Sequence, residues 1–226
     1  MYLHHELRLV TQHRQTEALK RIHWLHSLMG IQPGFIRTLA CRYLGSPDRY
    51  AWLRLWNEPG DNTTFRQTPE AKEFAATRPE GLYEPLPGGI ADNGHWQSVI
   101  EPQGKDLGSF LVRSAFRVGE GRDAEFIEMR HQYDKAAFQV PGITWIATFH
   151  RGEAGAENLY LTLLRAIDRE AFNELLESPL AASYREKLPA GLHETLTTEC
   201  YLIVDEVVPT KAGASRVEGM ASASGR

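Results

Sequence analysis

The sequence has few of the residues that mark disulfide-bonded or zinc-binding proteins. Its 226 residues include two cysteines, Cys41 and Cys200, which lie far apart and form no Cys-x-x-Cys pair. Neither a disulfide framework nor a zinc site is therefore indicated, and we expect a reducing, cytoplasmic location. No basic-then-apolar leader follows Met1, and no apolar run is long enough to cross a bilayer, so we expect no membrane association.

Positive charge is also limited. The chain has 25 Lys and Arg residues against 29 Asp and Glu, a formal net charge of −4, and no basic run interleaved with aromatic residues. This composition argues against nucleic acid as a partner. The P-loop, the Rossmann glycine fingerprint and the G-x-S-x-G hydrolase motif are absent as well. What remains is the composition of an ordinary globular protein, 42% hydrophobic and 24% charged.

The chain repeats itself at a spacing of 108 to 110 residues. The aligned landmarks are His23 with His131, Pro33-Gly34 with Pro141-Gly142, Tyr50 with Tyr160, Thr68-Pro69 with Ser178-Pro179, and Gly81–Glu84 with Gly191–Glu194. One spacing held across five landmarks indicates a tandem duplication. We expect one domain over residues 1–103, a second over 104–209, and a disordered polar tail over 210–226.

Each half predicts the order β-α-β-β-α-β of the ferredoxin-like unit. An extended segment ("LHHELRLV" or "SFLVRSAFRV") precedes an amphipathic helix near residues 14–29 or 123–138. A Pro-Gly turn then leads into two strands, and Thr68 or Ser178 is the expected N-cap of a second helical region with proline at its first position. Asp123 is the expected N-cap of the helix in the second half.

The strands predict burial of both faces of the sheet. In "YAWLRLW" the side chains on both faces are largely apolar, and "LYLTLLRA" has the same pattern. A sheet with one solvated face would instead alternate apolar and polar residues. We therefore expect an α+β protein in which two ferredoxin-like (βαββαβ) repeats form an intramolecular dimeric α+β barrel. Such a fused barrel needs no second copy to fold, although a further homo-oligomer remains open.

Several local motifs resemble one known family. The helix ending in "PGF" or "PGI", the tyrosine-led strand, and "TPEAKEF" or "SPLAASY" resemble the antibiotic biosynthesis monooxygenase family over residues 2–102 and 108–208. The resemblance implies a dimeric α+β barrel fold and a cofactor-independent oxygenase or a haem-degrading enzyme. The Trp and His of the haem-degrading members fall on Phe65 and Ala75 in the first half and on Leu175 and Arg185 in the second. We therefore expect no haem, no metal and no other cofactor.

The helix near residues 14–29 carries the first candidate for catalysis. Its apolar stripe is formed by Ala18, Ile22, Leu25 and Met29. His26 lies at the edge of this stripe, so it is either a hydrogen-bonded histidine at the edge of the core or a catalytic base that faces a pocket between helix and sheet. His23 lies further round and is expected at the rim. No third ligand stands at a spacing that would make these histidines a metal site.

The second half differs from the first at the equivalent positions. Arg130 and Asp134 stand where the first half has Ile22 and His26, and Tyr133 lies on the helix stripe. We therefore expect the two halves to be functionally unequal. A long segment with several glycines and prolines runs from Tyr83 to His95-Trp96 and is either a lid or a surface excursion, whereas His193 stands at the repeat-equivalent of Tyr83 with no long loop after it.

These residues favour a cofactor-independent oxygenase that acts with O₂ on an aromatic or polyketide-like small molecule. His26, or failing that His193, is the expected base, because the pKa of histidine lies close to neutral pH. Arg130 is expected to stabilise a developing oxyanion. Trp56, Tyr133, Tyr83, Trp96 and Asp134 are expected to contact the substrate. An isomerase, cyclase or lyase on a similar ligand, and a non-catalytic binding protein of the same fold, remain alternatives.

Overall fold

The computed structural model describes residues 1–86, 93–104, 107–153, 155–156 and 158–209. Part of the expected lid, residues 87–92, and the tail expected to be disordered, residues 210–226, lie outside the described residues. Among the described residues, no helix has both the length and the apolar character needed to cross a membrane. The chain divides into two units, and each is described separately.

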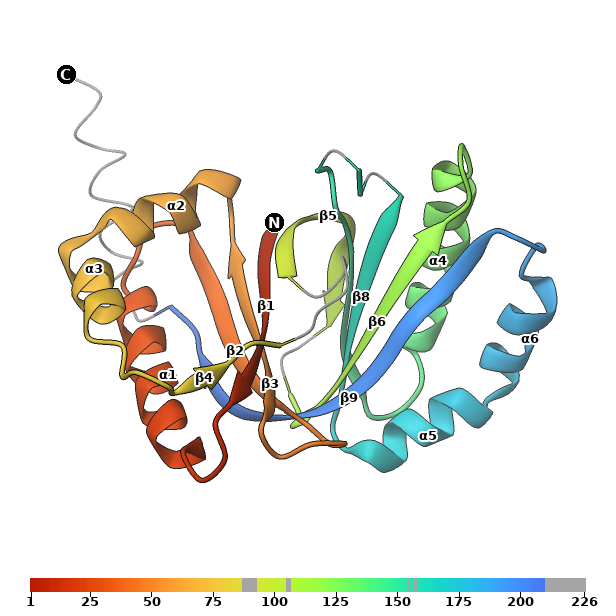
Figure 1. Ribbon diagram of the computed structural model, residues 1–226. Coiled ribbons are helices and arrows are strands. Elements are labelled where there is room, and N and C mark those ends of the chain that lie inside the picture. Colours follow the sequence, from red (N-terminus) through yellow and green to blue (C-terminus); the bar gives the residue numbers. More distant parts are fainter. Residues whose placement is uncertain (87–92, 105–106, 154, 157, 210–226) are drawn as a thin grey trace, which may run out of the picture. The chain divides into compact units, whose positions relative to one another are not determined.

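Unit 1 comprises Met1–Arg42, Ser46–His95 and the segment that begins at Val204. Its elements are β1 (Tyr2–Val10), α1 (Gln15–Met29), β2 (Phe35–Tyr43), β3 (Arg49–Trp56), α2 (Pro59–Gln67), α3 (Pro69–Ala76) and β4 (Tyr83–Glu84). The strands are antiparallel: β3 pairs with both β2 and β1, and β1 pairs with β4. The three helices lie on one face of these strands (Figure 1).

Unit 2 comprises Tyr43–Gly45 and Trp96–Ile203. Its elements are β5 (Asn93–Gly104), β6 (Phe110–Val118), α4 (Asp123–Ala137), β7 (Ile143–His150), β8 (Leu159–Ala166), α5 (Arg169–Glu177), α6 (Pro179–Lys187) and β9 (His193–Val207), except that the start of β5 up to His95 and the end of β9 from Val204 belong to unit 1. Strand β8 pairs with β6 and β7, β6 also pairs with β9, and β7 also pairs with β5, all antiparallel. The helices again lie on one face of the sheet (Figure 1). The expected α+β class with ferredoxin-like units is confirmed.

The two units have the same strand register. In unit 1 Arg8 of β1 faces Tyr50 of β3, and in unit 2 Phe116 of β6 faces Tyr160 of β8. Residues from β1 to β2 of unit 1 therefore correspond to residues from β6 to β7 of unit 2 at a spacing of 108. Residues from β3 onward correspond to residues from β8 onward at a spacing of 110. This register makes it possible to compare the units position by position.

Capping residues explain where several helices begin. The side chains of Thr68 and Ser178 accept hydrogen bonds from the backbone N–H of Ala71 and Ala181, and a proline follows each cap. Both N-caps were expected from the sequence and are confirmed. The expected cap at Asp123 is wrong, because the helix begins at Asp123 itself and Arg122 is the N-cap. The Asp123 carboxylate instead accepts a 2.7 Å hydrogen bond from the hydroxyl of Tyr160, which fixes it outside the cap position.

The core follows the stripe expected for the first helix. Ala18, Ile22, Leu25 and Met29 of α1 are all buried against the sheet. Every residue of β3 from Tyr50 to Trp56 is buried, and so is every residue of β8. Burying an aliphatic side chain of this kind contributes about 1.5–3 kcal/mol, so these strands and the helix stripe form the stable frame that positions the polar residues described next.

Candidate functional site

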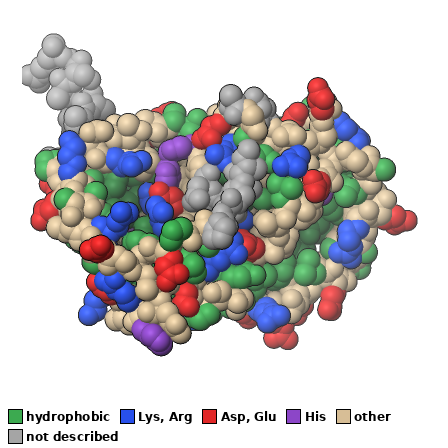
Figure 2. All heavy atoms as spheres, in the orientation of Figure 1, with side chains coloured by type: hydrophobic (Ala, Val, Ile, Leu, Met, Phe, Trp, Pro, Cys, Tyr) green, Lys and Arg blue, Asp and Glu red, His purple; other side chains and the backbone are tan. Residues whose placement is uncertain are grey.

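A cavity of about 280 Å³ lies within unit 1, between α1, α2, α3 and the strands β1 and β3. The side chains that line it share a pattern of positive charge and aromatic rings. They are Glu6, Arg8, Arg21, Leu25, Trp52, Arg54, Phe65, Arg66, Ala71, Lys72, Phe74, Ala75, Arg78 and Tyr83. The lining therefore contains six cationic side chains and a single carboxylate, that of Glu6. Figure 2 shows Lys and Arg side chains on several sides of a patch of apolar side chains at the left of the molecule.

Strand alternation brings the inner polar residues together. His4, Glu6 and Arg8 lie on one face of β1, because side chains of a strand alternate between its two faces. In the antiparallel register His4 faces Arg54, and Glu6 faces Trp52. Glu6 is therefore a diagonal neighbour of Arg54, within the reach of long side chains.

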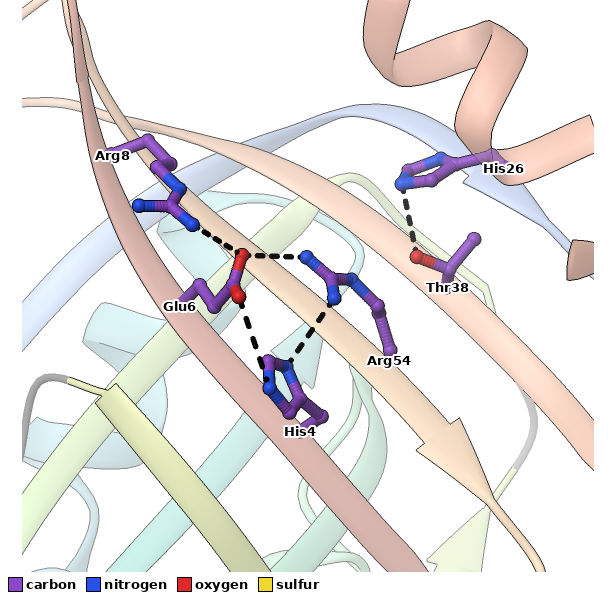
Figure 3. A network of polar contacts seen from close by, with 6 residues as sticks. All are labelled: His4, Glu6, Arg8, His26, Thr38 and Arg54. Atoms are coloured by element: carbon purple, nitrogen blue, oxygen red, sulfur yellow. Dashed lines mark hydrogen bonds and ion pairs between the residues drawn. The ribbon is translucent and has the colours of Figure 1, made fainter. Parts of the chain in front are cut away.

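The Glu6 carboxylate is shared by two arginines. Its Oε2 accepts hydrogen bonds from Arg54 Nη2 at 2.6 Å and from Arg8 Nη2 at 3.0 Å (Figure 3). Burial alone would raise the pKa of Glu6, but Arg54 and then Arg8 oppose it and hold the pKa at about 2. Glu6 is therefore a carboxylate at neutral pH, and it is too weak a base to remove a substrate proton there.

His4 completes this network as a neutral ring. Arg54 Nη1 donates to His4 Nδ1 at 3.4 Å, and His4 Nε2 lies 3.8 Å from Glu6 Oε1 (Figure 3). Because a guanidinium is always a donor, Nδ1 accepts and the ring proton sits on Nε2. Burial, followed by the charge of Arg54, lowers the pKa of His4 to about 3.

Aromatic rings form the walls of the cavity beside the cations. The guanidinium carbons of Arg8 and Arg54 lie 5.6 and 5.8 Å from the ring centre of Trp52, and Tyr83 packs edge-on against the same ring at 5.5 Å. Such cation–π pairs hold both guanidiniums close to a flat apolar surface. Burial raises the pKa of Tyr83 to about 12, and its buried hydroxyl has no hydrogen-bond partner among the described residues. Tyr83 can therefore donate a hydrogen bond to a bound oxygen.

The remaining cations have two different roles. Arg21 is buried, lies 4.0 Å from the ring centre of Phe74, and donates to the carbonyls of Thr77 and Phe74 at the end of α3. It therefore fixes this helix as well as adding charge. Arg66, Lys72 and Arg78 are exposed at the rim, and the described part of the chain supplies no ion-pair partner for them. The rim charges are therefore free to attract an anion.

His26 lies in the same unit but does not line this cavity. Its ring is 1% exposed, and its Nε2 accepts a 2.9 Å hydrogen bond from the hydroxyl of Thr38 (Figure 3). Its Nδ1 donates to Asp205 Oδ2 at 2.5 Å. Burial lowers the pKa of His26, although the hydrogen bond to Asp205 opposes this effect. His23 is exposed, as expected, and its Nδ1 lies 3.1 Å from the other oxygen of Asp205. The base role of His26 stays a prediction, since its contacts are those of a buried, fully bonded histidine.

We expect His26→Ala to act mainly on stability. The substitution removes two hydrogen bonds of a buried ring, which leaves Thr38 without its partner and Asp205 with only the exposed His23, so the free energy of unfolding should fall by about 1–3 kcal/mol. Urea unfolding measures this change, and His23→Ala, on the exposed side of Asp205, is the matched control. A loss of turnover of about 10²- to 10⁴-fold at unchanged stability would instead identify His26 as the base.

The other expected site residues are dispersed. Tyr83 lines the cavity of unit 1, whereas Trp56 is fully buried in the core beside Phe35 and Phe65. In unit 2, Arg130 and Tyr133 line a second cavity. Asp134 does not line it but is buried behind Arg130, at 2.7 Å from its Nε. Trp96 is fully buried with Arg151 over its ring at 5.7 Å.

His193 lines neither of the two cavities. Its ring packs edge-on against Phe116 and Phe126, with centres 5.0 and 5.4 Å away. Both ring nitrogens are buried without a hydrogen-bond partner among the described side chains, and burial, then Arg130, lowers its pKa. The base role of His193 also stays a prediction.

Most of the cavity of unit 1 was not anticipated from the sequence. The segment "LHHELRLV" carried the signal, because His4, Glu6 and Arg8 recur at the period of a strand on a face that the helices bury. Arg54 gave a similar signal in a strand that is otherwise apolar. Within the described chain, no group of three or more His, Cys, Asp or Glu side chains could hold a metal ion.

Solved structures with the same fold include two proposed monooxygenases and an anthrone oxidase-like protein. A proposed monooxygenase from Fusobacterium nucleatum matches with a TM-score of 0.72 at 13% identity, covering 92% of this chain and 94% of that chain. A second, from Lactobacillus acidophilus, has a TM-score of 0.67 at 11% identity, with 92% and 96% covered. An anthrone oxidase-like protein has a TM-score of 0.59 at 12% identity, with 93% and 94% covered. At these identities the similarity shows a shared fold only.

Sequence comparisons add nothing to this result. No protein-family model matches the chain, and no curated protein matches it. The fold is therefore established by structure, and the function must be argued from the residues in the cavities.

Proposed function

We propose that unit 1 binds an aromatic small molecule as its anion and activates that anion for reaction with O₂ without a cofactor. The observation that carries this proposal is the cavity itself, in which six cationic side chains and one carboxylate surround a space walled by Trp52, Phe65, Phe74 and Tyr83. A flat, electron-rich ring bearing a phenolate or enolate oxygen matches both features. The shared fold with an anthrone oxidase-like protein is compatible with such a substrate.

The proposed chemistry needs little from the protein beyond electrostatics. A cation beside a phenol or enol lowers the pKa of that group by about 1–3 units. The ligand then ionises close to neutral pH with no dedicated protein base, which agrees with the low pKa of Glu6 and the high pKa of Tyr83. The resulting anion is electron-rich enough to reduce O₂. Arg8, Arg54 and the hydroxyl of Tyr83 would hold its oxygen.

Oxidation of anthrone provides a balanced test reaction. The substrate CH₂ group becomes a carbonyl, so the substrate supplies all four electrons. One oxygen atom of O₂ enters the product and the other leaves as water. No external reductant is required, and one O₂ should be consumed for each anthraquinone formed.

We expect the purified protein to accelerate O₂ uptake with anthrone in the presence of a metal chelator and without added flavin. An oxygen electrode and the absorbance of anthraquinone together measure the rate and the stoichiometry. Heat-unfolded protein at the same concentration is the control for autoxidation. O₂ uptake no faster than in that control would contradict the oxygenase proposal.

A non-catalytic binding protein is the second candidate. It is favoured by the pKa values in the cavity, because Glu6 and Tyr83 titrate far from neutral pH and cannot exchange protons readily there. Saturable binding of anthrone or of a phenolate, without faster O₂ uptake, would support this alternative.

A further inference from the structure

Unit 2 contains a cavity at the place that corresponds to the cavity of unit 1. It measures about 170 Å³ and lies between α4, α5, α6 and the sheet. Several lining residues are repeat-equivalents of residues that line the first cavity: Tyr133 of Leu25, Thr162 of Trp52, Leu175 of Phe65, Ala181 of Ala71 and Tyr184 of Phe74. The two cavities therefore occur at the same position of the same fold.

The charge of the first cavity is absent at the equivalent positions of unit 2. The inner cations Arg8, Arg21 and Arg54 correspond to Phe116, Met129 and Leu164. The rim cations Arg66, Lys72 and Arg78 correspond to Leu176, Ala182 and Leu188. The carboxylate of Glu6 corresponds to the hydroxyl of Ser114. All seven charged positions of one cavity are therefore neutral in the other.

Two arginines do line the cavity of unit 2, but the buried one is paired with a carboxylate and the other lies at the exposed mouth. Arg130 is 7% exposed and its Nε forms an ion pair with Asp134 Oδ1 at 2.7 Å. Asp134 in turn accepts a 2.9 Å hydrogen bond from Thr148. Arg185 is exposed at the mouth, where it donates to the carbonyl of Leu176 at 3.3 Å. The buried guanidinium is already neutralised, so an anion would gain little there and would have to be desolvated.

The remaining surface is suited to a ring that carries a hydroxyl group. The rings of Tyr133 and Tyr184 lie 4.4 Å apart at one side of the cavity. Ser114, Thr162 and Thr198 also line the space. Ser114 Oγ lies 3.3 Å from Thr198 Oγ1, whereas the buried Thr162 hydroxyl lies 3.1 Å from that of Thr148. The rest of the lining is mostly aliphatic. A dry apolar cavity of about 150 Å³ is large enough to bind benzene, so this one has room for a small aromatic molecule.

We propose that unit 2 is a second, separate binding site, which takes a neutral aromatic molecule of one or two rings bearing a hydroxyl group. Tyr133, Tyr184 and the aliphatic side chains contact the ring, and the hydroxyls of Ser114 and Thr198 bind the ligand hydroxyl. The proposal does not depend on turnover in unit 1. The protein thus has two sites at equivalent positions of its two units, one for anionic and one for neutral aromatic ligands.

Methyl NMR of the full-length protein tests each cavity with its own reporters. Leu164, Leu175 and Ala181 report on unit 2, and Leu25 and Ala71 report on unit 1. We expect 2-naphthol, at a pH where it is neutral, to shift the methyl signals of unit 2. The shifts should be insensitive to NaCl concentration, because no net charge is neutralised on binding.

Two variants make the test specific to the cavity. Ser114→Phe fills the space from β6 and should weaken 2-naphthol binding by about tenfold or more, equivalent to 1.4 kcal/mol. Tyr184→Ala, on the surface helix α6, removes one ring of the wall and should also weaken binding if Ser114→Phe fails to fold. Glu186→Ala, exposed on α6 and not part of the lining, is the matched control and should bind as the unmodified protein does.

The proposal is overturned if 2-naphthol shifts only the methyl signals of unit 1, or if both cavity variants bind it as tightly as Glu186→Ala does. It is also overturned if 1-hydroxy-2-naphthoate, an anion, shifts the methyl signals of unit 2 more strongly than 2-naphthol. Failure of the function proposed for unit 1 would appear separately, as the absence of anion-induced shifts at Leu25 and Ala71.

Discussion

Replacing Arg54 by leucine is expected to abolish most of the anion affinity of unit 1. Leucine is the residue that unit 2 carries at the equivalent position, Leu164, so the fold accepts it there. Arg54 is buried and holds Glu6 at 2.6 Å, and a ligand oxygen would compete for the same guanidinium. A hydrogen bond to a charged group contributes about 1.5–3 kcal/mol. The affinity for a phenolate should therefore fall by about 10- to 100-fold.

Titration with 4-nitrophenol measures this effect, because its phenolate is coloured and its phenol is not. In the unmodified protein the pKa of the bound phenol should be at least about one unit below its value in solution. In Arg54→Leu that shift should largely disappear. Lys20→Leu, which removes a cation from the exposed side of α1, is the control for net charge. An unchanged phenol pKa and affinity in Arg54→Leu would refute the role given to this residue.

The stability of the variants separates binding from folding. Arg54→Leu leaves the Glu6 carboxylate part-buried with Arg8 as its remaining ion-pair partner, and breaking a buried pair by removing one member costs about 3–5 kcal/mol. The double variant Glu6→Ser with Arg54→Leu reproduces the pair found in unit 2, Ser114 and Leu164. Because no uncompensated carboxylate remains, it should be more stable than Arg54→Leu alone while it still fails to bind the phenolate.

Acid should destabilise the protein from about pH 6.5 downward, well above the range in which carboxylates alone would act. The folded state keeps His4 neutral, with a pKa of about 3, because of burial and the charge of Arg54. An unfolded chain binds a proton on histidine near pH 6.5. As the pH falls below that value, the unfolded state gains a proton that the folded state excludes. Stability is therefore lost progressively as the pH falls toward 3.

Glu6 acts in the same direction at lower pH. Its folded pKa of about 2 lies below the ordinary value of 4.5 for a glutamate, so the stability it contributes is present above pH 4.5 and is lost as the pH falls toward 2. Each unit of difference between the folded and the unfolded pKa corresponds to about 1.4 kcal/mol of stability. His4 alone should therefore remove about 3 kcal/mol of stability between pH 6.5 and pH 4.

Urea unfolding over this pH range checks the prediction, with His4→Gln as the informative variant. Glutamine can accept from Arg54 and cannot be protonated, so the slope of stability against pH between 6.5 and 4 should flatten. His23→Gln, exposed on α1, is the control and should retain the slope. A slope that is the same in His4→Gln as in the unmodified protein would mean that His4 is not the group that titrates.

The sequence alone determined the secondary structure and the class of fold, because these depend on local periodicity and capping. The stripe on α1, the two capped Pro-led helices and the buried strands β3 and β8 follow from residues close together in the chain. The internal spacing also predicted that two similar units would follow one another. In addition, the sequence singled out Tyr83, Arg130 and Tyr133, which do line cavities.

Only the tertiary structure decided the chemistry of the cavities. Arg54 and Glu6 are 48 residues apart, and the strand register alone brings them to 2.6 Å. The same holds for His26 and Asp205, which are 179 residues apart and whose contact buries a histidine that the sequence left open as a base. Charge on one side chain is readable from the sequence, but whether that charge is paired, buried or facing a ligand depends on neighbours that only the folded chain supplies.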